Sequence, residues 1–239
     1  MRIALVVFII GIIAVPALAD SEPIHIGGWG TLTGGVRFVD ASGLNDYFGE
    51  NDFDEISSWW PAYGISGYGI FAGRIVLGAS AGFSRLDSSG SDADLRVIGF
   101  NGQIEAGYAV LNGPFGLLIP YGGFGGYEQS LNFDGDLRFI EIQGDDQPGD
   151  DDDLSLSRSG MHAVAGVAYY FPVKFAEGAS GRYAMFMPGV RIGGTVELFG
   201  DEFQDKGGNE LLDATELHYH TFFIRLEIGF GGGKGKPVQ

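Results

Sequence analysis

Residues 221–230 read TFFIRLEIGF, and this stretch decides the fold. Its even-numbered residues are all large and apolar, whereas its odd-numbered residues include Thr, Arg, Glu and Gly. A period of two residues is typical of a β-strand, because successive side chains point to opposite faces of the strand. The stretch therefore predicts a strand with one apolar face and one mixed, mostly polar face.

The same alternation recurs along the chain. In residues 94–111, for example, Ile98, Phe100 and Ile104 alternate with Asn101 and Gln103. The pattern predicts eight strands. They cover 24–39, 61–72, 74–86, 94–111, 114–133, 154–171, 181–199 and 215–231. The second, third and sixth of these alternate less cleanly than the others.

The apolar faces are long and rich in aromatic residues, while the opposite faces mix glycine with isolated charges. This pattern fits lipid outside a small, crowded, polar interior. The predicted connections also alternate in length. Long ones at 40–60, 87–93, 134–153 and 200–214 alternate with short ones around Gly73, at 112–113 and at 172–180. The sequence therefore predicts an all-β fold, a transmembrane antiparallel up-and-down β-barrel of eight strands. A soluble β-sandwich is the alternative, and residues 136–143 leave a ten-stranded barrel open.

The amino terminus predicts export. Arg2 precedes the apolar run 3–15, and Ala17-Leu18-Ala19 places small residues at the −3 and −1 positions of a signal-peptidase site. We therefore expect a signal peptide over 1–19 and one outer-membrane β-barrel over 20–239, with 231–239 as a flexible periplasmic tail. An uncleaved membrane anchor is the alternative. The chain has no cysteine, which excludes disulfides and thiolate chemistry.

Acidic residues are concentrated in the predicted long connections. The formal net charge is −17, and 23 of the 31 Asp and Glu residues fall in these connections when the second is extended by one residue to Asp94. An acidic rim repels polyanions, so nucleic-acid binding is excluded. The run 145–153 (DDQPGDDDD) supplies oxygen ligands that divalent cations prefer, but it matches no EF-hand spacing. We therefore expect divalent cations at the acidic loops without assigning a metal site.

The predicted barrel interior holds charges of both signs. The expected inward-facing polar network consists of Arg37, Glu105, Glu128, Arg191, Glu197, Arg225 and Glu227. His25 and His162 are further candidates for the interior. An eight-stranded barrel is only wide enough for its own side chains, and an unpaired buried charge is costly. The set therefore predicts salt bridges that close the interior, with a narrow gated path for small solutes as the alternative. No cofactor is expected.

Aromatic residues cluster near the predicted strand ends. Rings favour the headgroup level of a membrane, which predicts an aromatic girdle. Its candidate members are Trp59, Trp60, Phe71, Tyr108, Phe115, Tyr169, Tyr170 and Phe171. Ordinary β-propensity is the alternative explanation for these positions.

With these features the chain resembles the OmpA-type and OmpX-like eight-stranded outer-membrane barrels. The resemblance is architectural and spans essentially all of 20–239. It implies a cell outer-membrane location and recognition by the barrel assembly machinery. The even number of predicted strands puts both termini on the periplasmic side. Such barrels often end on an aromatic residue, whereas here Phe230 is followed by nine further residues. Residues 231–239 do not resemble the peptidoglycan-binding domain of the full-length OmpA group, so we do not expect tethering to the cell wall.

Some barrels of this architecture modify lipid A, and the deacylases among them use a His-x-Ser pair. None of the four histidines is followed by serine at that spacing, so we assign no catalytic residue. The sequence predicts a non-enzymatic structural or surface-interaction barrel. Its expected partners are outer-membrane lipid and lipopolysaccharide. A small channel or carrier for small or hydrophobic solutes is the alternative, and a lipid A-modifying enzyme ranks below it.

Overall fold

The computed structural model describes residues 23–39, 45, 56–89, 93–135, 154–178, 181–205 and 220–234. The predicted signal peptide, the acidic run 145–153 and the segment 136–143 lie outside these residues, so the predictions about them stay predictions. Within the described part of the chain, no helix is long and apolar enough to cross a membrane.

Ten strands make up the described structure. They are β1 (Ile26–Val39), β2 (Trp59–Phe71), β3 (Ile75–Ser89), β4 (Ala93–Tyr108), β5 (Leu111–Gly113), β6 (Gly116–Gly135), β7 (Leu154–Tyr170), β8 (Val173–Glu177), β9 (Arg182–Gly200) and β10 (Thr221–Lys234). Eight of them are long and two, β5 and β8, are short.

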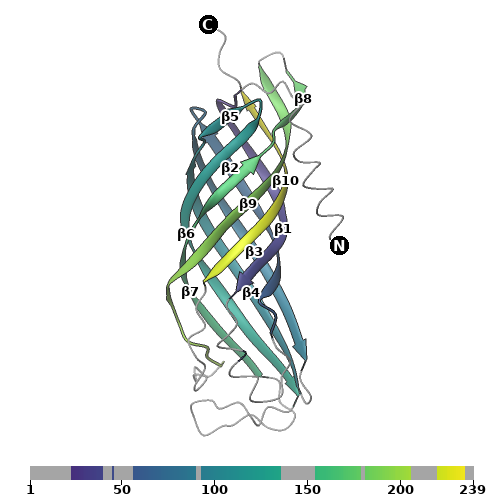
Figure 1. The fold of residues 1–239 in the computed structure, drawn as a ribbon, viewed down its shortest axis with the longest axis vertical. Helices are drawn as coiled ribbons and strands as arrows, with labels where there is room; N and C mark the ends of the chain where they lie inside the picture. Colours follow the sequence, from purple (N-terminus) through teal and green to yellow (C-terminus); the bar gives the residue numbers. More distant parts are fainter. Residues whose placement is uncertain are drawn as a thin grey trace.

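The eight long strands form a closed barrel. Each is antiparallel to its neighbours in the order β1-β2-β3-β4-β6-β7-β9-β10, and β10 pairs with β1 along its whole length. The short strand β5 pairs with β6, and β8 pairs with the start of β9. Both short strands lie at the end of the barrel where β1 begins and β10 ends, at the top of Figure 1. We call this the terminal end, and the opposite one the loop end. The prediction of an eight-stranded up-and-down barrel is confirmed.

The predicted strand boundaries agree with the observed ones to within a few residues in most cases. Two differences matter. The last strand continues to Lys234, so residues 231–234 belong to β10 and not to a flexible tail. The predicted short connection 172–180 contains β8, which resumes pairing with β9 after an interruption at Phe171 and Pro172. The proline cannot donate a ladder hydrogen bond, which explains the break between β7 and β8.

The turn between β2 and β3 shows how a short connection is built. Ala72 and Gly73 both have positive φ angles, 48° and 71°, and the Arg74 N–H donates to the Phe71 carbonyl over 3.0 Å. Two consecutive positive φ values inside a four-residue turn closed by this hydrogen bond are typical of a type I′ turn, whose twist matches the flanking strands. Glycine adopts this conformation without strain, so the prediction of a tight turn at Gly73 is confirmed.

Side chains alternate between the inside and the outside of the barrel as predicted. In β10 the even-numbered residues from Phe222 to Phe230 are outward and mostly exposed, whereas Phe223, Arg225 and Glu227 are buried. The prediction of an aromatic girdle is wrong in part. Trp59, Phe71, Tyr108 and Phe115 are exposed, but Trp60, Tyr170 and Phe171 are buried. Trp60 and Tyr170 occupy inward positions of their strands, so they fill the interior and do not face lipid.

Candidate functional site

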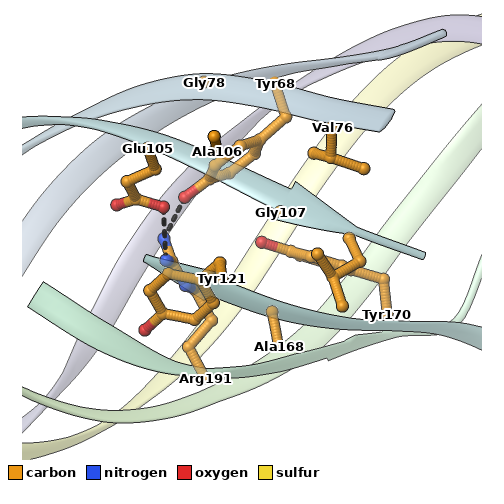
Figure 2. Close-up of a pocket in the computed structure, with 11 residues that line it drawn as sticks. Tyr68, Val76, Gly78, Glu105, Ala106, Gly107, Tyr121, Ala168, Tyr170 and Arg191 are labelled. Carbon is orange, nitrogen blue, oxygen red and sulfur yellow. Dashed lines mark hydrogen bonds and ion pairs between the residues drawn. The ribbon is translucent and has the colours of Figure 1, made fainter. Parts of the chain in front are cut away.

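The centre of the barrel interior is organised by Arg191, whose side chain is 1% exposed. Its Nη2 atom lies 2.5 Å from Oε2 of Glu105, and Nη1 donates to the Tyr68 hydroxyl. The guanidinium also stacks on Tyr121, with Cζ 4.0 Å from the ring centroid. Arg191 lies on β9, and the residues that it contacts lie on β4, β2 and β6. Its side chain therefore connects four strands of the barrel (Figure 2).

A second carboxylate completes the charge balance around Arg191. Oε1 of Glu227, on β10, lies 3.7 Å from Nη1 of Arg191, and Oε2 accepts a hydrogen bond from the Tyr170 hydroxyl. Glu227 is 1% exposed. Because a buried charge without a partner is strongly destabilising, both carboxylates depend on this arginine. We call Arg191, Glu105 and Glu227 the central charge cluster.

Hydrogen bonds extend from this cluster toward the loop end. Oε1 of Glu105 accepts from Ser80 Oγ over 3.0 Å and from Gln103 Nε2 over 2.6 Å. The Gln103 side-chain carbonyl is in turn 3.1 Å from Nε2 of His162, which is fully buried. Nearer the loop end, Arg37 donates to Asn101 over 2.7 Å. The inward polar residues of β1, β3, β4 and β7 therefore form two hydrogen-bonded groups, one joined to the cluster through Gln103 and the other formed by Arg37 and Asn101.

A further arginine lies closer to the loop end. Arg158 Nε donates to Oε1 of Gln129 over 2.7 Å, and its Nη2 is 3.9 Å from Oε2 of Glu197. Its guanidinium also packs 5.1 Å from the ring centroid of Phe203. This contact joins a segment beyond β9 to the interior.

The terminal end of the interior is apolar. The buried residues there include Ile24, Ile70, Val76, Leu117, Ile119, Met185 and Met187. We call this set the apolar floor. The side chain of Asn112 fixes it by accepting from the Ile24 N–H over 3.0 Å and donating to the carbonyls of Ile24 and Gly73, each over 2.8 Å. Three segments are thus tied together across the terminal end.

Little space remains beside the central charge cluster. The cavity lined by Tyr68, Glu105, Tyr121, Tyr170 and Arg191 has a volume of about 10 Å³. A cavity of this size holds one water molecule at most. Figure 2 shows the side chains of this region converging from opposite walls.

The structure brings six of the seven predicted network residues to the inward face, in more than one group. Glu105, Arg191 and Glu227 form the central cluster, Glu197 is near Arg158, and Arg37 contacts Asn101. Arg225 is buried with its Cζ atom 4.3 Å from the Phe223 ring centroid. Of the histidines, His162 is inside the barrel. His25 is half-buried at the terminal end, where its backbone N–H donates to the Lys234 carbonyl.

The prediction that Glu128 points inward is wrong. Its neighbours Tyr127 and Gln129 are buried, and Glu128 is exposed on the outward face of β6. Its register partners, Phe100 and Ser159, are also outward. The position lies toward the loop end, so we expect the carboxylate to be solvated there.

Sequence reasoning missed the tyrosines that hold the cluster, Tyr68, Tyr121 and Tyr170. A signal for two of them exists in the glycine positions. A Cβ atom on Gly78 would collide with the Tyr68 ring, and one on Gly189 would collide with the Tyr170 ring. Each of these large inward rings therefore lies over a glycine of the adjacent strand, where only a residue without a side chain leaves room.

No metal-binding cluster is present in the described ranges. They contain no group of three or more His, Asp or Glu side chains that could hold a metal ion. Ser159 Oγ donates to Asp201 over 3.0 Å, but both are exposed. Nδ1 of His220 accepts from the Glu197 N–H over 3.2 Å, which uses that nitrogen in a backbone contact.

Comparisons with known proteins give likenesses of architecture. No family model matches the chain, and no curated protein matches it. Among solved structures, the chain is similar to Ail, the attachment invasion locus protein of Yersinia pestis. The two share 9% identity over 87% of this chain and 98% of that one, with a TM-score of 0.46.

It is also similar to the outer membrane protein OprG of Pseudomonas aeruginosa, with 15% identity over 90% and 100% of the two chains and a TM-score of 0.36. The outer membrane protease OmpT of Escherichia coli matches at 8% identity over 91% and 99%, with a TM-score of 0.35. The resemblance to the OmpA-type and OmpX-like barrels therefore concerns the fold, and no activity is transferred from these proteins.

Proposed function

We propose that the protein is a non-enzymatic integral protein of the cell outer membrane, with a closed interior and a structural or surface-interaction role. Its exposed outward face supports the membrane location. Large apolar side chains are exposed on all eight long strands, among them Leu32, Ile65, Leu77, Ile104 and Phe124. Exposed apolar surface of this extent is unfavourable in water and favourable against lipid.

The central charge cluster carries the proposal of a closed interior. Arg191 contacts side chains from four other strands, and the adjacent cavity has room for one water molecule at most. Toward the terminal end, the apolar floor follows directly. A path for solutes through the interior would require the cluster and the floor to separate. Both arrangements support a filled barrel over the channel or carrier of the alternative interpretation.

Conductance in planar lipid bilayers tests this proposal. We expect no channel openings from the refolded protein, and Arg191→Met should not create stable openings, because the apolar floor is independent of it. Stepwise conductance in the unaltered protein would favour the channel. Fractionation of outer and inner membranes, with a mobility shift on boiling, tests the location. A soluble product without a shift would contradict the proposed membrane barrel.

The orientation completes the proposal. We place the terminal end in the periplasm and the acidic loops outside, where lipopolysaccharide and divalent cations would be their partners. Labelling of intact cells at a cysteine introduced in 145–153 should succeed, whereas a cysteine at Arg74 should react only after the cells are opened. The reverse result would invert the orientation. A lipid A modification assay without turnover would support the non-enzymatic assignment, and recognition by the barrel assembly machinery is proposed from the fold.

A further inference from the structure

On the outward face of β9 and β10, the type of side chain changes from one register pair to the next toward the terminal end. Phe186 and Phe230 are register partners, with ring centroids 5.3 Å apart. The next outward pair is Ala184 and Gly232, and the last is Arg182 and Lys234. A pair of rings is therefore followed by a pair of small residues and then by a pair of cations.

The last pair places two positive charges directly opposite each other. Arg182 and Lys234 are both exposed register partners, and neither forms an ion pair with another described residue. Like charges directly opposite on adjacent strands are destabilising. An anion between them would turn this repulsion into a favourable contact, since Arg and Lys both bind phosphate oxygens well.

The residues beside this pair carry a methyl group or no side chain, and we call this row of small residues the notch. On β1, Gly28 is the register partner of Gly232, so three adjacent strands present Ala184, Gly232 and Gly28 in one row. Phe230, on the membrane side of the notch, is 64% exposed. An acyl chain could pack on the rings while the linked headgroup lies over the notch and reaches the cations.

The other cations at the terminal end are engaged differently. Arg74 Nη1 donates to the Tyr108 hydroxyl over 2.6 Å, and Lys174 Nζ lies 4.3 Å from the Tyr183 ring centroid. Glu177 is the only acidic residue among the described positions of β8 and the start of β9. In a chain with a net charge of −17, this basic end is the exception and complements an anionic lipid surface.

We propose that Arg182 and Lys234 bind the phosphate of an anionic phospholipid, whose acyl chain packs on Phe186 and Phe230. This site rests on the proposed membrane location of the barrel. Its occupant is a lipid of the leaflet that faces the terminal end. A headgroup with net negative charge is preferred over a zwitterionic one, because the two cations have no described carboxylate to balance them.

Native mass spectrometry of the refolded full chain tests the proposal. The protein is loaded with either phosphatidylglycerol or phosphatidylcholine in mixed micelles, and the lipids retained on the folded barrel are counted. We expect retention of phosphatidylglycerol over phosphatidylcholine, and about a tenfold loss in the double variant Arg182→Gln/Lys234→Gln. Excess inorganic phosphate should displace little of the lipid, because it gains nothing from the rings.

The matched control is Arg74→Gln/Lys174→Gln, which removes two positive charges from the same end of the barrel. It should retain phosphatidylglycerol almost as well as the unaltered protein. Equal losses in both double variants would overturn the site and leave only general attraction to a basic rim. Displacement by inorganic phosphate alone would assign the cations to a free anion. A mobility shift on boiling, measured for each variant, reports the barrel itself and separates failure of this site from failure of the proposed membrane location.

Discussion

The central charge cluster and the apolar floor fill the same barrel in opposite ways. The cluster uses three charged side chains and the tyrosines around them, whereas the floor uses aliphatic side chains and two methionines. The floor lies nearer to the water at the terminal end, and the charges lie deeper. This order means that the floor screens the cluster from water on one side. Charge pairing inside is therefore obligatory, while the floor needs only the right volume.

Removal of the arginine should have the largest effect. Arg191→Met leaves Glu105 and Glu227 buried without their cation, and we expect it to lower the free energy of unfolding by about 3–5 kcal/mol. Urea titration of the barrel in lipid vesicles measures this change. The triple variant R191M/E105Q/E227Q should recover much of the loss, because no charge is then left unpaired. A single variant as stable as the unaltered protein would show that the cluster contributes little to stability.

The floor should respond to volume alone. Ile70 is fully buried, and Ile70→Ala should cost about 2–5 kcal/mol because it opens a cavity. Met187→Leu keeps the volume and should cost less than about 1.5 kcal/mol in the same titration. If the two substitutions had equal effects, the contrast between a floor governed by volume and a cluster governed by charge would not hold.

The Asn112 contacts should have a smaller and more local effect. Asn112→Ala removes three hydrogen bonds to Ile24 and Gly73, and we expect a loss of about 1–3 kcal/mol. Hydrogen exchange at the Ile24 amide should accelerate, since its acceptor is gone. Asn112→Asp keeps that acceptor and serves as the control, so equally fast exchange in both variants would argue against the side-chain contact.

An exposed group of ion pairs should contribute the least to stability among the features compared. At the loop end Asp87 accepts from Arg85 and Arg96 over 2.9 and 3.0 Å, with all three side chains about half exposed. Asp87→Asn should lower stability by less than about 1 kcal/mol, and the effect should vanish in high salt. A loss comparable to that of Arg191→Met would mean that burial does not decide the value of a charge pair here.

The barrel fold could be predicted from the sequence because apolar and polar residues alternate clearly in strands such as β4 and β10. It failed for Glu128 because the glycine-rich run 122–126 hides the alternation of β6. The inward positions of that strand are set by Leu117, Ile119 and Tyr121, all buried, and this places Glu128 outside.

The partners inside the barrel could not be derived in the same way. Arg191 and Glu105 are 86 residues apart in the chain, and their contact depends on the relative stagger of non-adjacent strands. The inward position of the tyrosines could not be predicted because an aromatic residue is compatible with both the inward and the outward face of a barrel strand. Trp60 and Tyr170, predicted at the membrane interface, turned out to be inside for the same reason.

The seam between β1 and β10 has a consequence for the order of folding. It pairs Ile26 with Lys234, which are separated by roughly two hundred residues of chain, whereas β2 and β3 meet across a three-residue connection. Closing so long a loop is entropically the most demanding step, so we expect hairpins to form early and the seam last. Until then both edge strands expose unpaired backbone groups, and the unclosed barrel is open to strand exchange with a neighbouring chain.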